Sequence, residues 1–121
     1  YDQAGLMVRV GSACWIKTSV EYEPHALAQL GAVVTNDGFS DWSVQDFPHA
    51  THDVCLRIRR TASDFIIEFA ANDLADWKLM RIAHLNLENV VPLSCGLYAC
   101  SPKGAGFQAE FHALTIVRPP G

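Results

Sequence analysis

Apolar and polar residues alternate with a period of two along most of this chain, and this alternation limits the fold more than any other feature. Successive side chains of a β-strand point to opposite faces, so a strand with one buried face shows this period. The stretch "CWIKTSVEY" at 14–22 is the clearest example. Its two predicted faces are Cys14, Ile16, Thr18, Val20 and Tyr22 on one side and Trp15, Lys17, Ser19 and Glu21 on the other.

The preceding stretch "AGLMVRV" alternates in the same way, and the short loop "GSA" separates the two stretches. A loop of this length that contains glycine is typical of a β-hairpin. Leu6, Val8 and Val10 form one face of the first strand. Pairing across the loop predicts that Arg9 lies opposite Trp15 and that Met7 lies opposite Lys17.

Further strand-like stretches follow: "LAQLGAVVTN", "FSDWSVQ", "HDVCLRIRR", "DFIIEFAA", "DWKLMRIAHL", "CGLYACS" and "GFQAEFHALTIV". The "NDG" at 36–38 indicates a tight hairpin turn, and residues 61–63 make a second turn. Helical spacing also fits "DWKLMRIAHL", although we expect a strand there. The residues predicted to point inward from the middle strands are Val54, Leu56, Ile58, Phe65, Ile67 and Phe69.

About nine strands without a convincing helix predict an all-β fold: one antiparallel β-sandwich of jelly-roll type over residues 1–121. Within the strand that follows the "NDG" turn, Trp42 shares a face with Val44. We expect that face to pack into the core, with Asp41 and Ser43 on the polar side. Trp15 is then the better candidate for a flat surface that meets a ligand, and the place of Trp77 stays open.

Composition narrows the classes of partner. The 121 residues carry a formal net charge of −4, and the nine Lys and Arg residues are scattered apart from Arg57, Arg59 and Arg60. We therefore expect no nucleic-acid partner, because such binding needs a basic patch. No apolar stretch is long enough to span a membrane, so we expect no membrane partner. The four cysteines form no C-x-x-C pair, which favours reduced thiols and a cytoplasmic location.

Several phrases, taken together and in order, carry a family resemblance: "YDQAGLMVRV", "WIKTSVEY", "VVTNDGFSDWS", "RIAHL" and "GLYACSP" followed by "FHALTIV". Over essentially its whole length the chain resembles the little-characterised family labelled regulation-of-enolase-like, within the concanavalin A-like lectin/glucanase superfamily. The resemblance implies a sandwich of two curved antiparallel sheets. Members of the family usually carry further strands before the Tyr-Asp-Gln phrase. A sandwich that lacks these N-terminal strands exposes sheet edges, so we expect a homodimer or higher homo-oligomer.

Catalytic and metal sites are poorly supported by the sequence. Sandwich glucanases use two carboxylates on one strand face, whereas Glu68 and Asp73 are five residues apart and Glu21 and Glu23 are followed at once by Pro24. We therefore expect no enzyme, no catalytic residue and no cofactor.

Two groups of metal-ligand residue types are present, and each has a simpler reading. His49 and His52, near Asp46 and Asp53, could contribute to a zinc site, but a solvated loop explains them more simply. Asn36, Asp37 and Asp41 could bind calcium, although a turn accounts for the first two. We expect no metal site.

A polar sheet face is the remaining candidate. Its predicted members are Arg9, Trp15, Lys17, Glu21, Arg57 and Glu68, each on the outward register of its strand, and Arg59 shares that register. An aromatic ring among hydrogen-bonding groups suits the hydroxyls and the C–H surfaces of a sugar. The leading hypothesis is a non-catalytic, carbohydrate-binding sandwich. A protein-interaction or regulatory module is the alternative, and an unrecognised glycoside hydrolase is the third.

Overall fold

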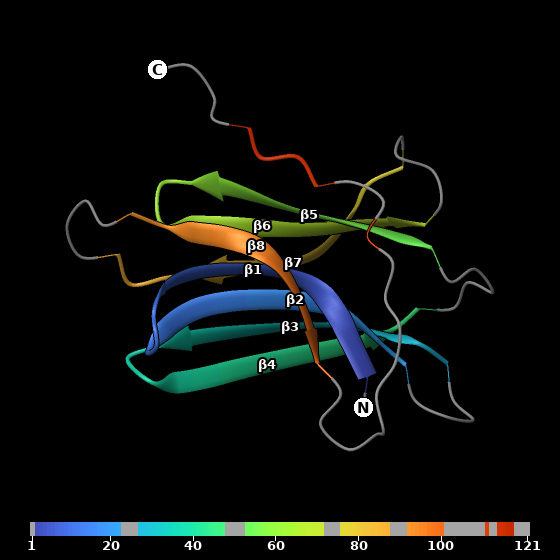
Figure 1. The fold of residues 1–121 in the computed structure, drawn as a ribbon, viewed down its shortest axis with the longest axis horizontal. Helices are drawn as coiled ribbons and strands as arrows, with labels where there is room; N and C mark the ends of the chain where they lie inside the picture. The colour runs from blue at the N-terminus through green and yellow to red at the C-terminus, as the bar shows by residue number, and fades with distance from the viewer. Residues whose placement is uncertain are drawn as a thin grey trace.

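A computed structural model describes residues 2–22, 27–47, 53–71, 76–87, 92–100, 111 and 114–117. Within this part of the chain eight β-strands and no helix are present (Figure 1). The strands are β1 (Asp2–Gly11), β2 (Cys14–Tyr22), β3 (Gln29–Asn36), β4 (Phe39–Asp46), β5 (Val54–Thr61), β6 (Asp64–Ala71), β7 (Lys78–His84) and β8 (Ser94–Cys100). The predicted all-β architecture is confirmed, and "DWKLMRIAHL" contains a strand as expected.

The strands form two antiparallel sheets that face each other (Figure 1). The five-stranded sheet has the order β4-β3-β2-β1-β8, and the three-stranded sheet has the order β5-β6-β7. Five of the six strand pairs join strands that are consecutive in sequence, and the sixth joins β8 to β1 at the edge of the larger sheet. The two predicted cross-strand pairs, Arg9 with Trp15 and Met7 with Lys17, are both present.

Both predicted tight turns form as two-residue loops. Asp37 has φ of 52° and Gly38 has φ of 81°, which is the left-handed pair that a type I′ hairpin turn requires. Ala62 has φ of 56° in the loop between β5 and β6. An alanine there is unusual, because its Cβ makes the left-handed region unfavourable.

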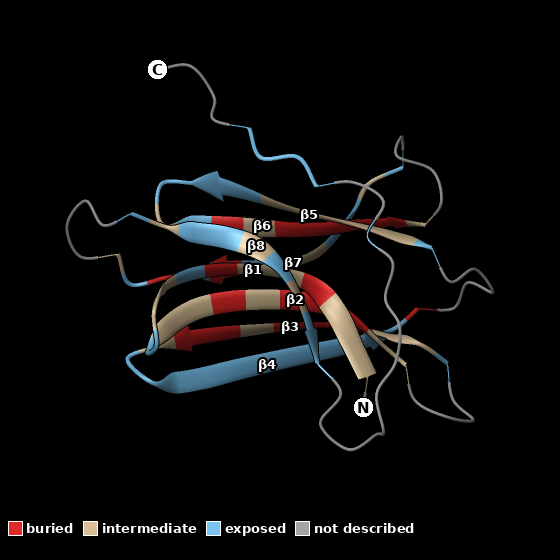
Figure 2. Cartoon of the chain, in the orientation of Figure 1, coloured by how far each residue is buried: buried red, intermediate tan, exposed pale blue. Residues whose placement is uncertain are grey.

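The core lies between the sheets and is made by the inward registers of their strands (Figure 2). Its fully buried large side chains are Ile16, Thr18, Leu30, Phe47, Phe65, Ile67 and Leu85. The predicted inward positions on β6 are confirmed, because Phe65, Ile67 and Phe69 are all buried. Thr18 tolerates burial because its hydroxyl donates a hydrogen bond to the Gly31 carbonyl at 2.9 Å.

The prediction for Trp42 is wrong. Trp42 pairs with Val33, and Val33 pairs with Lys17, so all three side chains lie on the outer face of the five-stranded sheet. The Trp42 side chain is 65% exposed. β4 is an edge strand, and its inner face meets Arg81 from β7 in place of an apolar layer. The Arg81 guanidinium donates to the Ser43 hydroxyl at 3.2 Å and lies 3.3 Å from the Asp41 carboxylate.

The last predicted strand, in "GFQAEFHALTIV", is not present where the structure describes it. Phe111 and residues 114–117 lie outside any strand. The other residues of that stretch lie outside the described residues. Eight strands, in place of the nine expected, are therefore seen in the described part of the chain.

Candidate functional site

The outer face of the five-stranded sheet brings together four of the six predicted site residues. Trp15, Lys17 and Glu21 alternate along β2, and Arg9 lies beside Trp15 on β1. The buried Ile16, Thr18 and Val20 on the same strand point the opposite way. The period-two pattern of β2 thus placed these side chains on one common face, as predicted.

The other two predicted residues do not join that face. Arg57 on β5 pairs with Glu68 on β6, and both point away from the core on the outer face of the three-stranded sheet. Alternation distinguishes inward from outward residues, but a sandwich has two outward faces. The predicted site is therefore divided between opposite sides of the molecule.

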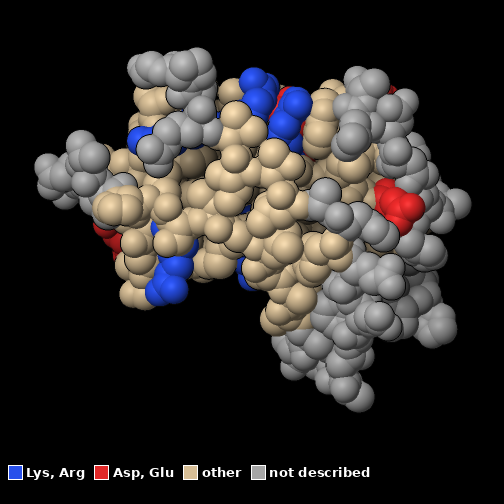
Figure 3. All heavy atoms as spheres, turned by 45° about the horizontal axis from the view of Figure 1, so that its top comes forward, with Lys and Arg blue, Asp and Glu red and all other residues tan. Residues whose placement is uncertain are grey.

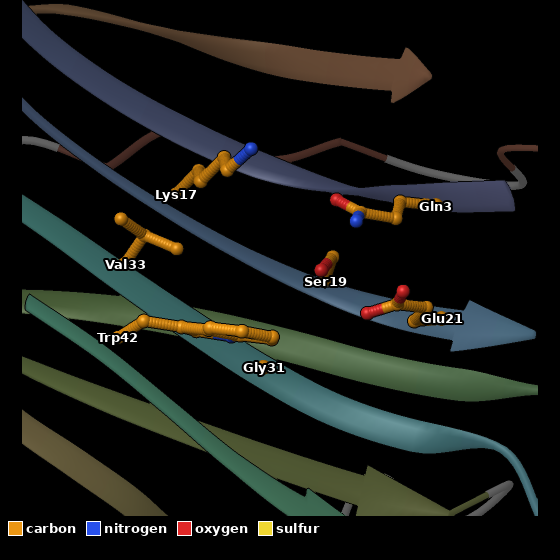
Figure 4. Close-up of a pocket in the computed structure, with 7 residues that line it drawn as sticks. All are labelled: Gln3, Lys17, Ser19, Glu21, Gly31, Val33 and Trp42. Carbon is orange, nitrogen blue, oxygen red and sulfur yellow. The ribbon is translucent and has the colours of Figure 1, made fainter. Parts of the chain in front are cut away.

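A groove of about 200 Å³ crosses the outer face of the five-stranded sheet (Figure 4). Its lining residues are Gln3, Lys17, Ser19, Glu21, Gly31, Val33 and Trp42. In Figure 4 the indole of Trp42 extends across β3 toward Gly31, and Lys17, Gln3, Ser19 and Glu21 surround the other side. An added Cβ at Gly31 would lie 3.7 Å from the Trp42 indole nitrogen, an ordinary van der Waals distance, which shows that the indole lies close against β3.

Sequence reasoning missed Trp42 as a member of this site. Both faces of β3 carry apolar residues near its middle, with Val33 on one face and Ala32 and Val34 on the other. The usable signal was the two-residue turn at Asp37 and Gly38, because that turn fixes the pairing of β3 with β4. Counting back from it pairs Trp42 with Val33, as the structure shows.

Aromatic rings hold Lys17 along this face. Its ammonium nitrogen lies 5.7 Å from the ring centroid of Trp15 and 5.7 Å from that of Tyr98. Both distances are within the range of cation–π attraction. Trp15, the predicted ligand platform, therefore contacts the neighbouring lysine and helps to position its charge.

Tyr98 on β8 contributes a buried hydroxyl next to the groove. Its oxygen has no hydrogen-bond partner in the described part of the chain. Burial raises the pKa of Tyr98 to about 12, and the negative charges of Cys100 and Glu21 act in the same direction. The polar hydroxyl of Ser19 acts in the opposite direction and lowers the pKa of Tyr98. The two hydroxyls nevertheless do not form a hydrogen bond.

Gly5 explains how the strands meet beside Tyr98. It pairs with Ser19 on β2 and with Tyr98 on β8. A Cβ at this position would overlap the Thr18 carbonyl oxygen, so only glycine fits here.

On the opposite side of the sandwich, Glu68 joins two arginines. One oxygen, Oε1, accepts a hydrogen bond from Nε of Arg57 at 3.0 Å and from Nε of Arg59 at 2.7 Å. These bonds, that from Arg59 first, lower the pKa of the Glu68 carboxyl below its ordinary value. Trp77 lies with its ring 4.1 Å from the guanidinium carbon of Arg57, which gives this tryptophan a defined place. We name Arg57, Arg59, Glu68 and Trp77 the arginine pair site.

A comparison with protein families shows what the chain is related to. The model of a family described as "Protein of unknown function (DUF1349)" matches residues 1–119. The chain belongs to this family. The resemblance inferred from the sequence is confirmed by "Regulation of enolase protein 1" of Saccharomyces cerevisiae, which is 32% identical over 122 residues.

The chain spans only part of the relatives that it matches. The alignment covers 100% of this DUF1349 chain and 59% of the yeast protein. A crystal structure of a functionally unknown protein from Saccharomyces cerevisiae superposes with a TM-score of 0.71 and 32% identity. That match covers 84% of this chain and 52% of the yeast chain, and it supports the antiparallel sandwich.

In this DUF1349 chain, the residues considered as a calcium site make contacts that stabilise the fold. The Asn36 side-chain oxygen accepts a hydrogen bond from the Asn86 backbone N–H at 2.7 Å, and Asp41 pairs with Arg81. Among the residues that the structure describes, no group of three or more His, Cys, Asp or Glu residues could hold a metal ion. His49, His52, Glu23 and Asp73 lie outside the described residues.

His84 resembles a catalytic histidine only superficially. Ser63 and Asp64 both approach the same ring nitrogen, Nδ1, at 3.4 and 3.2 Å. A catalytic triad uses the two nitrogens separately, one for the nucleophile and one for the carboxylate. The geometry therefore gives no nucleophilic site at His84.

Two remaining features concern the thiols and the membrane. All four cysteines are free, and burial raises the pKa of the Cys14 thiol, which disfavours the reactive thiolate. The described residues include no helix that is long and apolar enough to cross a membrane.

Proposed function

We propose that the groove on the outer face of the five-stranded sheet binds a carbohydrate. One observation carries the proposal: the exposed indole of Trp42 lies beside a lysine, a carboxylate, an amide and a hydroxyl that line the same groove. Tryptophan is enriched at binding interfaces, because its large apolar ring also carries a polar N–H group. The ligand class follows from this combination of groups.

A sugar ring presents C–H groups on its faces and hydroxyls around its edge. The indole of Trp42 offers a flat apolar surface to a ring face. Gln3 and Ser19 can donate and accept hydrogen bonds, Lys17 can donate, and Glu21 can accept. The groove thus supplies both kinds of contact that a pyranose needs.

The size of the groove favours a single sugar unit. Its volume of about 200 Å³ is below the roughly 300–1,000 Å³ typical of pockets that bind drug-sized ligands. We propose binding without hydrolysis, because Glu21 is the sole carboxylate among the described lining residues and glycoside hydrolysis generally uses two.

Thermal shift with a panel of mono- and oligosaccharides tests the proposal, because a ligand that binds the folded state raises Tm. Trp42→Ala should abolish the shift produced by any active sugar. Gly31→Leu should also abolish it, because the new side chain fills the groove. Trp77→Ala is the matched control, since this tryptophan lies against Arg57 on the outer face of the other sheet. A sugar response that survives Trp42→Ala but is lost in Trp77→Ala would contradict the proposed site.

A protein-interaction module is the second candidate function. All residues of β4 are exposed, and this edge strand presents Phe39, Trp42 and Val44 to solvent. Such an edge can pair with a strand of another chain. The name of the yeast relative, "Regulation of enolase protein 1", also refers to regulation. Stoichiometric capture of one protein, lost when Val44→Pro blocks pairing along β4, would favour this function over sugar binding.

The same edge supports the proposal of a homodimer or higher homo-oligomer. Leu79 and Ile82 add exposed apolar surface on the edge strand β7 of the other sheet. Light scattering coupled to size exclusion should give a mass of at least two chains, and Val44→Pro should reduce it. A cytoplasmic location is proposed from the four free thiols.

A further inference from the structure

The arginine pair site lies outside the proposed groove, on the opposite face of the sandwich. Its central group is Glu68, whose side chain is only 11% exposed although it points away from the core. Arg57 and Arg59 cover it from the neighbouring strand β5. In Figure 3, basic side chains gather around a small acidic patch at the top of the view, where β5 and β6 lie.

Within the described part of the chain, most donors of the two guanidinium groups have no hydrogen-bond partner. Each guanidinium has five N–H donors, and each bonds Glu68 through its Nε–H alone. The terminal Nη groups of Arg57 and Arg59 make no hydrogen bond to the described residues. Because both Nε atoms bond the same oxygen, the two guanidinium groups are held side by side.

The site is also held in place and retains positive charge. The Trp77 ring stacks on Arg57 and restricts the plane of its guanidinium. Two arginines and one glutamate leave a net charge of +1. One arginine balances the charge of Glu68, so the positive charge of the second remains, and the Arg59 side chain is 54% exposed.

We infer that the arginine pair site binds a phosphate monoester. A carboxylate has two oxygens and satisfies one guanidinium fork. A phosphate monoester has three terminal oxygens and a charge near −2, so it can accept from two adjacent forks at once. Glu68 acts as the positioning residue, since it aligns both arginines and offsets their mutual repulsion before the ligand arrives.

The test uses the indole N–H resonances of the three tryptophans in ¹H–¹⁵N NMR spectra. Titration with methyl phosphate, at constant ionic strength, should shift the Trp77 resonance saturably and leave the Trp42 resonance unchanged. Acetate at the same ionic strength should produce at most a small shift. Trp42 reports on the proposed sugar groove and Trp77 reports on the arginine pair site. The spectra therefore distinguish a failure of one proposal from a failure of the other.

Three variants sharpen the result. Arg59→Gln should weaken methyl phosphate binding by about tenfold or more, since it removes a charge-assisted fork. Arg59→Lys keeps the charge but not the fork and should also weaken binding. Arg60→Gln is the matched control, because Arg60 donates instead to the Ala62 carbonyl, and it should change little. An unchanged Trp42 resonance shows that each variant is folded.

The inference would be overturned by any of three outcomes. The first is the absence of a saturable Trp77 shift with methyl phosphate. The second is an equal shift with acetate, which would indicate a general attraction of anions. The third is undiminished binding by Arg59→Lys, or a loss of binding in Arg60→Gln as large as that in Arg59→Gln. In either case net charge, rather than the paired forks, would explain the effect.

Discussion

The two outer faces of the sandwich hold similar residue types in different arrangements. Each has a tryptophan, a glutamate and basic side chains. On the five-stranded sheet, Trp42 lies exposed against a groove and Lys17 rests between two aromatic rings. On the three-stranded sheet, Glu68 is covered by two arginines and Trp77 stacks on one of them.

The difference follows from where each acidic group sits relative to its basic neighbours. On β5 and β6, Arg57 is directly opposite Glu68, so the opposite charges meet at hydrogen-bond distance. On β2, Lys17 and Glu21 are four residues apart along one strand, which is too far for direct pairing in an extended chain. An open groove beside a lysine and an ordered cluster of arginines thus arise from similar classes of residue.

The largest effect is expected from a core substitution that destabilises both faces together. Phe65 is buried in the core between the two sheets. Phe65→Ala should lower the free energy of unfolding by about 3–5 kcal/mol, because a large cavity replaces the ring. Urea denaturation measures this change, and Ile82→Ala, at an exposed position, should cost far less. Equal losses would show that the sheets do not share this core.

A second change should separate the two faces. The Arg81 side chain is 16% exposed and connects β7 to β4 through Asp41 and Ser43. Arg81→Met should lower stability by about 1–3 kcal/mol and speed amide hydrogen exchange in β4. The Trp42 groove should lose its ligand response, whereas the arginine pair site should keep its own. Unchanged exchange in β4 would show that β3 alone holds this strand.

Alkaline pH should lower the stability of the protein through Tyr98, on the groove side of the molecule. The pKa of Tyr98 is raised to about 12 in the folded state, whereas unfolded tyrosine titrates near 10. The unfolded chain therefore releases this proton first, and stability falls as the pH rises from about 10 to about 12. The loss should be on the order of 1–2 kcal/mol, less than the full shift implies because part of the ring is exposed.

Ultraviolet difference spectra report tyrosine ionisation directly. Tyr98→Phe should remove one late-titrating tyrosine and flatten the fall in stability over this pH range. Burial also raises the pKa of Tyr22, so a residual dependence should remain in the variant. A tyrosine spectrum in which every group ionises near pH 10 would contradict the buried position of Tyr98.

The smallest expected effect compares the two hairpin turns. The turn beside Trp42 uses Gly38, whereas the turn between β5 and β6 places Ala62 in the left-handed region. Ala62→Gly relieves this strain but increases the freedom of the unfolded chain, and the net gain should be about 0.5–1 kcal/mol. Thermal unfolding measures the gain, and Gly38→Ala should shift Tm in the opposite direction.

The sequence was sufficient for the order of strands and for most inward positions. Phe65 and Ile67 are apolar while their neighbour Glu68 is charged, so the period identifies the face. The inward face of β4 was harder to predict, because its inner side meets Arg81 and its outer side carries Trp42. A rule that places apolar residues inside fails at such an edge strand.

The division of the candidate site could not be read from alternation either. Arg9 and Arg57 are both outward residues of their strands, but no feature local to either strand says which sheet contains it. Sheet membership depends on contacts between segments far apart in the chain. The pairing of Arg57 with Glu68 was nevertheless accessible, because the turn at 61–63 sets that hairpin register.

The pairing of β8 with β1 has a consequence for synthesis of the chain on the ribosome. β1 ends at Gly11 and β8 begins at Ser94, so about 80 residues must be added before the two strands can meet. At typical elongation rates this interval lasts on the order of ten seconds. Throughout it, the free side of β1 exposes the backbone donors and acceptors that β8 will later satisfy. Nascent chains on the same messenger should be most prone to associate through β1 in this interval.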